Sequence, residues 1–273
     1  MTVVPPMPRT WSSRLRWTVG DSWTIARSGL IHWTRNPSVI LYNLLQPIVM
    51  VVLFGFVFGS AMSVAGGGDY REFLMPGLFA QTMMFGVMST MMVMSVHATK
   101  GITDRFRSMP ISPAAVVLGR SANDMLNSVL ELAILVLCGW AVGWNWHNGT
   151  ANALAAIGLL LLLRFALIWV GIHLGLMITP EAAGTAYVVL MPLTMLANTF
   201  VSPTQMPGWL SGIAEWNPLS ATVAATRALF GNPGWGGDSW AAQHAQLLAI
   251  GWPVLLVAVF LPLSVRRYRR LDR

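Results

Sequence analysis

The chain has 273 residues, of which 55% are hydrophobic and only 10% are charged, and its formal net charge is +7. Soluble proteins carry about 25% charged residues, so this chain has too few charges to cover a water-facing surface of its size. An integral membrane protein is therefore expected in place of a soluble one. The single cysteine, Cys138, excludes an internal disulfide. With scattered histidines and no cysteine pair, no metal site is expected.

Six segments are long and apolar enough to cross a bilayer, which takes about 20 mostly apolar residues in a helix. We therefore predict an all-α integral membrane protein with six transmembrane helices. No internal repeat or low-complexity linker divides the chain, so residues 1–273 are expected to form a single transmembrane domain. The predicted spans are residues 38–62, 73–97, 119–144, 152–178, 182–202 and 245–265.

The basic residues predict the orientation of these spans. Fourteen of the 17 Lys and Arg residues lie before the first span, between the second and third spans or at the very start of the third, or after the sixth. The opposite loops contain only Arg71 and Arg227. Because Lys and Arg concentrate in cytoplasmic loops, both termini are predicted to be cytoplasmic. A nucleic-acid-binding protein would explain neither this asymmetry nor the apolar segments, so no nucleic-acid partner is expected.

Two stretches outside the spans have a composition typical of the membrane surface. Residues 11–35 alternate Trp and aliphatic residues with arginines, which predicts an amphipathic interfacial helix at the N-terminus. The external stretch from residue 202 to 243 contains Trp209 and Trp216 but no run long enough to cross. Prolines and glycines divide it, so short external re-entrant helices are expected before the last span.

Charged residues inside the predicted spans are candidate functional residues, because an ionisable group in hydrocarbon is usually paired or faces a cavity. Glu131 and Arg164 lie at similar depths on consecutive antiparallel spans, and we predict an intramembrane ion pair between them. Either a structural pair or a substrate contact would explain it. Asp124 lies nearer the end of its span and is expected to be solvated. The many methionines of the second span suit either helix packing or an adaptable pathway.

No motif for ATP binding or catalysis is present in the sequence. A phosphate-binding P-loop requires a lysine after a glycine-rich turn, and the only lysine, Lys100, follows His-Ala-Thr. The metalloprotease HExxH motif and the hydrolase GxSxG motif are also missing. The chain is therefore expected to have no catalytic residues and to bind no cofactor itself.

Two segments resemble a known family. Residues 100–120 read KGITDRFRSMPISPAAVVLGR, and residues 200–232 read FVSPTQMPGWLSGIAEWNPLSATVAATRALFGN. Together they resemble the permeases of type-2 ABC exporters, especially the daunorubicin- and doxorubicin-resistance type, over most of the chain. The resemblance implies a permease dimer, of identical or different chains, in the cell membrane. It also implies two separate ATPase subunits that carry ATP and Mg, and export of drug-like amphipathic compounds.

The resemblance also assigns two candidate sites. A permease without an ATP site must receive force through a cytoplasmic element, and the loop after the second span is expected to dock into the ATPase. Its coupling residues would be Lys100, Asp104, Arg105, Phe106, Arg107, Met109 and Pro110. The external stretch is expected to close the outer end of the pathway through Pro207, Trp209, Trp216, Asn217, Pro218 and Arg227.

Other interpretations remain for each of these predictions. The basic loop could be an ordinary cytoplasmic loop, and the external stretch a simple tether. The cargo could be a lipid or glycan intermediate instead of a drug. A proton-coupled secondary transporter would favour several acidic residues within the spans, whereas mainly Glu131 is found.

Overall fold

The computed structural model describes residues 37–57, 64, 67–99, 113–234 and 237–270, and within these ranges every regular element is helical. The long elements are α2 (Pro37–Val52), α3 (Tyr70–Thr99), α5 (Pro113–Ala141), α6 (Gly149–Gly175) and α12 (Ala245–Arg270). The short ones are α7 (Pro180–Thr185), α8 (Tyr187–Met195), α9 (Gly208–Glu215), α10 (Pro218–Phe230), α11 (Trp240–Gln243) and a 3₁₀ turn at Pro203–Gln205. The predicted interfacial helix at residues 11–35 lies outside the described residues.

Four of the described helices are long and apolar enough to cross a membrane: Tyr70–Thr99, Leu118–Ala141, Gly149–Gly175 and Ala245–Tyr268. They correspond to the second, third, fourth and sixth predicted spans, with ends that differ by a few residues. Within the described residues, the predicted all-helical fold with membrane-spanning helices is thus supported, whereas a total of six crossings stays a prediction.

The first and fifth predicted spans are less regular than a single α-helix. Helix α2 continues as a π-helical turn at Leu53–Val57, so helical structure covers residues 37–57. The fifth span, predicted at residues 182–202, is divided into α7 and α8 and then continues as turns. Pro192 lies inside α8 and lacks the N–H that a continuous helix requires. Beyond α8, the backbone N–H of Asn198 donates to Ser220 Oγ of α10 at 2.9 Å instead of extending the helix.

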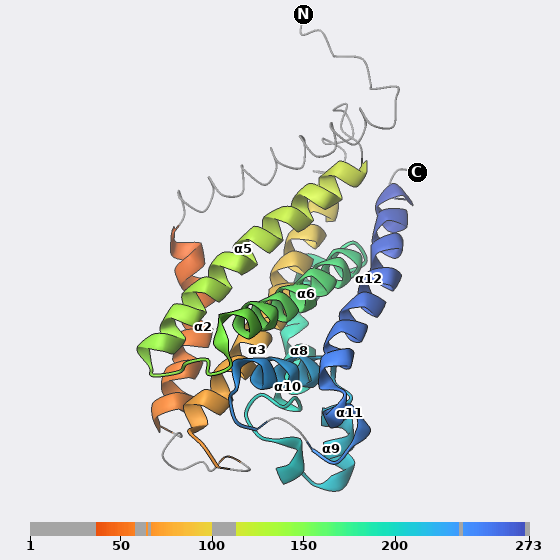
Figure 1. The fold of residues 1–273 in the computed structure, drawn as a ribbon. Coiled ribbons are helices and arrows are strands. Elements are labelled where there is room, and N and C mark those ends of the chain that lie inside the picture. Colours follow the sequence, from red (N-terminus) through yellow and green to blue (C-terminus); the bar gives the residue numbers. More distant parts are fainter. Residues whose placement is uncertain (1–36, 58–63, 65–66, 100–112, 235–236, 271–273) are drawn as a thin grey trace, which may run out of the picture.

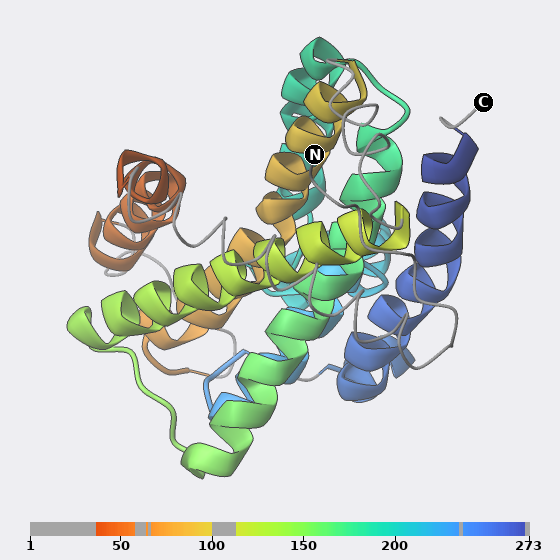
Figure 2. The ribbon, with the colours of Figure 1, turned by 90° about the horizontal axis from the view of Figure 1, so that it is seen from above.

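Helices α2, α3, α5 and α12 run between two ends of the molecule, and α6 crosses between them at mid-height (Figure 1). The start of α5 and the end of α12 lie at one end, and α9, α10 and α11 gather at the other. Seen from above, α2 stands to one side of the molecule and α12 to the opposite side (Figure 2). Helices α9 to α11 therefore lie at the end away from the basic C-terminal turn of α12, as expected for an external stretch.

Helices α3 and α6 approach each other closely through glycines. A Cβ atom on Gly171 would lie 3.0 Å from Thr90 Cβ, and one on Gly175 would lie 2.5 Å from the carbonyl oxygen of Met91. These glycines are four residues apart on one face of α6, which is the small-residue spacing that allows transmembrane helices to pack backbone to backbone. The seam between α3 and α6 forms the centre of the helix bundle.

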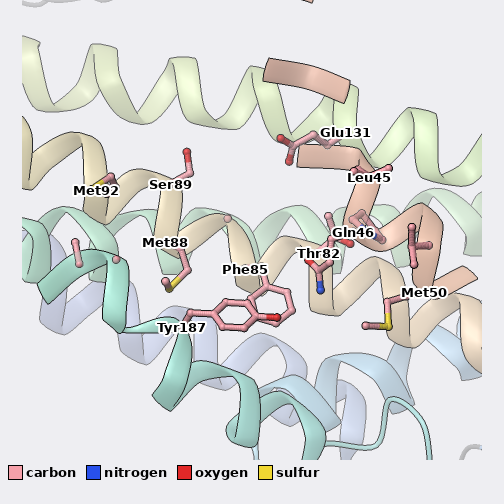
Figure 3. A pocket seen from close by; sticks show the side chains of 15 residues that line it. Leu45, Gln46, Met50, Thr82, Phe85, Met88, Ser89, Met92, Glu131 and Tyr187 are labelled. Atoms are coloured by element: carbon pink, nitrogen blue, oxygen red, sulfur yellow. The ribbon is translucent and has the colours of Figure 1, made fainter. Parts of the chain in front are cut away.

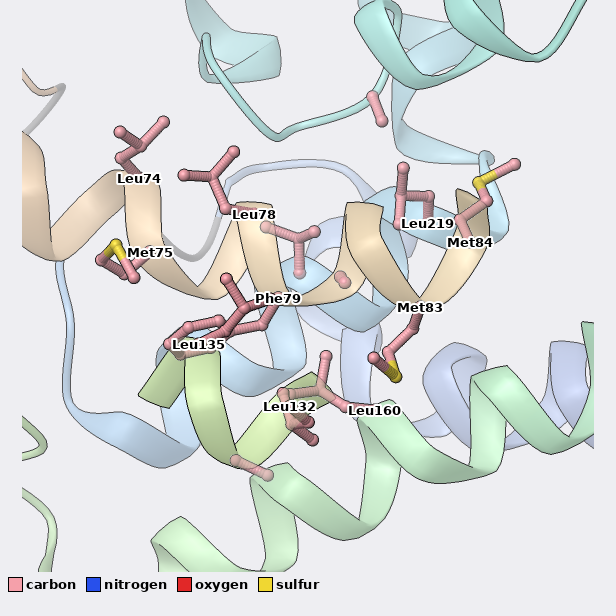
Figure 4. Packing of buried hydrophobic residues seen from close by; sticks show 14 of the residues in the cluster. Leu74, Met75, Leu78, Phe79, Met83, Met84, Leu132, Leu135, Leu160 and Leu219 are labelled. Atoms are coloured by element: carbon pink, nitrogen blue, oxygen red, sulfur yellow. The ribbon is translucent and has the colours of Figure 1, made fainter. Parts of the chain in front are cut away.

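A core of large apolar side chains fills the half of this bundle that lies next to α10 (Figure 4). Phe79 of α3 packs edge-on against Trp144, with ring centroids 5.1 Å apart, and Trp144 packs edge-on against Phe230 of α10 at 5.0 Å. The Trp144 indole N–H also donates to Asn232 Oδ1 at 2.9 Å, so its polar atom is satisfied within the core. This packing fixes α10 against α3 and the end of α5.

Helix α10 has well-defined ends that set its position. The Asn217 side chain accepts a hydrogen bond from the backbone of Leu219, and Pro218 occupies the first turn, as is typical of a capped N-terminus. Gly231 ends the helix at φ 77°, a left-handed conformation in which a Cβ would lie 2.8 Å from Asn148 Oδ1. The caps hold Arg227, in the last turn, in a fixed direction.

Candidate functional site

A cavity of about 820 Å³ lies between α2, α3, α5 and the α7–α8 segment. Figure 3 shows the side chains of Leu45, Met50, Phe85, Met88 and Met92 around it. Gln46, Thr82, Ser89, Glu131 and Tyr187 add polar groups to this largely apolar lining. We call this cavity, together with the residues that line it, the pocket.

Aromatic and methionine side chains give the pocket its shape. The rings of Phe85 and Tyr187 stack with centroids 5.5 Å apart and an interplanar angle of 20°. Met50, Met88 and Met92 come from two different helices, and their flexible thioether side chains adapt to irregular shapes. Such a lining suits amphipathic molecules that are held by shape and apolar contact more than by fixed hydrogen bonds.

Behind the pocket, a buried group of polar side chains joins α3, α5 and α6. Arg164 of α6 donates from Nε to Ser128 Oγ at 2.8 Å and from Nη2 to Thr90 Oγ1 at 3.1 Å. Thr90 in turn donates to Asp124 Oδ2 at 2.7 Å, and Asp124 Oδ1 lies 2.7 Å from Arg120 Nη2. We call these five residues the Arg164 cluster. The Thr90 hydroxyl links a buried cation to a buried carboxylate.

The Arg164 guanidinium also lies against Gly86 of the pocket wall. A Cβ atom at Gly86 would come within 2.6 Å of Arg164 Cζ, so only glycine leaves room for the guanidinium there. Gly86 is one of the residues that line the pocket. The Arg164 cluster is therefore separated from the pocket by little more than the α3 backbone.

The structure shows part of the surroundings of the two predicted intramembrane charges. Glu131 lines the pocket, while the recorded hydrogen bonds of Arg164 go to Ser128 and Thr90. Asp124 and Glu131 both attract the Arg164 charge electrostatically. A direct ion pair between Glu131 and Arg164 stays a prediction.

The expectation that Asp124 is solvated is wrong. Its side chain is 3% exposed and is held by Thr90 and Arg120. Arg120 comes from the preceding turn of α5, a spacing visible in the sequence. Thr90 lies on another helix, so its role could be found only from the packing.

At the end of the bundle that carries α9 to α11, Arg227 is fully buried and donates to α3 and to the segment that follows α8. It donates from Nε to the Phe73 carbonyl at 2.8 Å, from Nη1 to Asn198 Oδ1 at 2.7 Å and from Nη2 to the Thr199 carbonyl at 3.1 Å. Its Cζ also lies 3.6 Å from the centroid of the Phe73 ring. Burial lowers the pKa of Arg227 to about 9, which leaves it charged at neutral pH.

The other residues predicted at this end fall into two groups. Asn217 is buried, and its side-chain amide donates to the Leu193 carbonyl at 3.0 Å, which ties α10 to α8. Trp209 and Trp216 of the α9 region are instead exposed. Trp216 stacks on Trp240 with centroids 5.9 Å apart. Pro207 and Pro218 stand at the starts of α9 and α10.

Comparison with known proteins identifies the family of this helical bundle. Residues 21–230 match the family described as ABC-2 type transporter, which covers most of the chain. The chain belongs to the ABC-2 type transporter family. It is therefore a membrane-embedded permease-type protein, and the resemblance inferred from residues 100–120 and 200–232 is confirmed.

Individual relatives of this ABC-2 protein are named as transport permeases. It is 31% identical to a daunorubicin resistance ABC transporter permease protein of Streptomyces coeruleorubidus over 85% of this chain and 80% of the relative. It is 25% identical to a doxorubicin resistance ABC transporter permease protein of Mycobacterium tuberculosis, covering 73% of this chain and 66% of that one. A putative transport permease of Pyropia yezoensis is 23% identical over 77% and 74% of the two chains.

The predicted coupling loop of this ABC-2 protein stays a prediction. Lys100, Asp104, Arg105, Phe106, Arg107, Met109 and Pro110 all lie outside the described residues. The loop nevertheless lies in the chain between α3 and α5, and these two helices together contribute four of the five residues of the Arg164 cluster. Among the described residues, no group of three His, Cys, Asp or Glu side chains could hold a metal ion.

Proposed function

We propose that this chain is the transmembrane subunit of an ABC exporter that moves hydrophobic or amphipathic compounds, of the drug or antibiotic type, out of the cell. A separate ATPase subunit supplies the energy, with ATP and Mg bound there and not on this chain. Two permease copies cross the cell membrane, each with six spans and cytoplasmic termini. The single observation that carries this proposal is an apolar, methionine-rich pocket within a chain of the ABC-2 family.

The pocket is proposed as part of the path of the transported compound. Its volume of about 820 Å³ lies within the range of small-molecule sites in proteins. Its walls come from α2, α3, α5 and α8, so relative movement of these helices would change its shape. The names of two relatives, which refer to daunorubicin and doxorubicin resistance, support a drug-like cargo.

The loop at residues 100–112 is proposed as the contact with the ATPase. Reversing two charges, with Arg105→Glu and Arg107→Glu together, should prevent co-purification of the ATPase subunit with the full-length chain. Arg269→Glu with Arg270→Glu is the matched control, since it reverses two charges in the C-terminal basic segment.

Co-purification from membranes, normalised to the amount of inserted permease, measures this effect. The control variant is expected to retain the ATPase. If the loop variant also retains both the ATPase and ATP-dependent transport, the docking proposal is wrong.

A further inference from the structure

The Arg164 cluster lies beside the pocket, on α3 and α5, the two helices that the proposed coupling loop joins, and on α6. Thr90 is nine residues before the end of α3, and Asp124 is eleven residues after the start of α5. At 1.5 Å per residue, both lie about 15 Å along their helices from the loop. The pocket residues Gly86 and Glu131 lie one to two turns farther from the loop on the same two helices.

The hydrogen bonds of the cluster connect all three helices through two hydroxyl groups. Thr90 Oγ1 accepts from Arg164 and donates to Asp124, so it stands between the cation of α6 and the anion of α5. Ser128 Oγ accepts from Arg164 and donates to the Asp124 carbonyl at 2.8 Å. Thr90, Asp124, Ser128 and Arg164 are all at least 96% buried, so water does not compete for these bonds.

Close packing adds to this polar connection. The guanidinium fills the space that a side chain at Gly86 would occupy, and Gly171 of α6 contacts Thr90 directly. A shift of α3 relative to α6 would therefore break hydrogen bonds inside a medium that offers no replacement partners. Moving α3, α5 and α6 together therefore costs less free energy than sliding one of these helices past the others.

We propose that the Arg164 cluster is a coupling element that makes α3, α5 and α6 move as one body, so that displacement of the coupling loop reaches the pocket. Thr90 and Asp124 are positioning residues in this proposal, and they contact neither the ATPase nor the cargo. The inference rests on the proposed function, because it requires an ATPase that acts on the loop. It gives a role to the Arg164 cluster, since apolar side chains would suffice to pack these helices together.

The test measures how ATP alters access to the pocket. Cys138 is the only cysteine, so Cys138→Ser provides a cysteine-free background in which Ser89→Cys reports from the exposed wall of the pocket. The rate of maleimide labelling is measured in the full complex with its co-purified ATPase, with and without ATP and vanadate. In the Cys138→Ser, Ser89→Cys protein without further changes, ATP with vanadate should change the maleimide labelling rate by about fivefold or more.

Thr90→Val tests the cluster, because it keeps the shape of the side chain and removes the bridging hydroxyl. ATP hydrolysis should continue, but nucleotide should no longer change the labelling rate. Thr90→Ser should retain the response. Thr222→Val is the matched control: Thr222 is also fully buried, and its recorded bond goes to the Pro218 carbonyl of its own helix. It should retain the response as well.

The outcomes separate a failure of the proposed transport path from a failure of the coupling role of the Arg164 cluster. If nucleotide does not change the labelling rate in the protein with Thr90 intact, the pocket is not part of the transport path. The coupling role of the Arg164 cluster is then wrong as well. A full nucleotide response in the Thr90→Val protein would overturn only the coupling role. Should Thr90→Val fail to assemble, Ser128→Ala removes the other bridging hydroxyl, and a full response there would equally contradict the inference.

Discussion

At the residue scale, Arg227 shows how a single buried cation organises the external end. Its donors reach Phe73 on α3 and the Asn198–Thr199 segment after α8. Its guanidinium is held by carbonyl and amide oxygens and by the face of the Phe73 ring. Multiple bonds to neutral acceptors and an aromatic face are a known way to accommodate a buried arginine. Arg227 therefore holds the external helices on the start of α3.

Replacing Arg227 should destabilise the permease strongly. Arg227→Gln loses several charge-assisted hydrogen bonds and leaves buried carbonyls without donors, which should cost about 3 kcal/mol or more. Arg227→Lys should be intermediate, because it keeps the charge and loses the planar fork. The thermal unfolding midpoint in detergent measures the change. Arg266→Gln, at an exposed arginine, should leave the midpoint unchanged, and an equal loss in both variants would contradict the role of Arg227.

A second residue-scale prediction concerns the aromatic pair of the pocket. Tyr187 is 42% exposed, so Tyr187→Ala should have little effect on stability while removing the stacking surface over Phe85. Aromatic pairs contribute about 1 kcal/mol, so apparent affinity for an aromatic cargo should fall about fivefold. ATP-dependent uptake of rhodamine 6G into inverted vesicles, measured against dye concentration, reports this change. Tyr187→Phe keeps the ring and should transport normally; unchanged uptake by Tyr187→Ala would argue against this path.

At the element scale, the central seam depends on the glycines of α6. A Cβ on Gly175 would overlap the Met91 carbonyl and lie 2.7 Å from Met94 Cβ, whereas Gly158 on the same helix has no atom within 4 Å of such a position. Helix α3 would have to move away from α6 to admit a larger residue at Gly175. The same small-residue contact brings Thr90 within reach of Arg164.

Gly175→Ala should therefore lower the free energy of unfolding by about 1–3 kcal/mol through overpacking. Gly158→Ala should be neutral or slightly stabilising, because alanine favours the helix more than glycine does. The two thermal midpoints, measured on the same preparation, provide the comparison. Equal midpoints would show that the α3–α6 contact tolerates a wider separation.

The elements also show how far sequence reasoning reaches. Four long helices could be predicted because a continuous apolar stretch is a local signal. The break after α8 could not, because hydropathy does not reveal that Asn198 bonds to Ser220 and Arg227 on another helix. The burial of Asp124 is also invisible in the sequence: its position near the end of a span predicts contact with solvent, whereas Thr90 and Arg120 hold it inside the bundle. The predicted role of the loop at residues 100–112 rests on resemblance alone.

At the scale of the whole molecule, the proposed ATPase contact, the Arg164 cluster and the pocket lie on connected helices. The proposed ATPase contact lies between α3 and α5, the Arg164 cluster joins these helices to α6, and the pocket opens beside the cluster. The helices α9 to α11 are proposed to close the far end of the path. The proposed function requires that transport depend on a partner that hydrolyses ATP.

The most direct test is transport by purified components in proteoliposomes. We expect ATP-dependent rhodamine 6G transport when the full-length permease is reconstituted together with its co-purified ATPase subunit, and no such transport from the permease alone. Vanadate should abolish it, and a protonophore should not. Rapid uptake by the permease alone, insensitive to vanadate and abolished by the protonophore, would contradict the account.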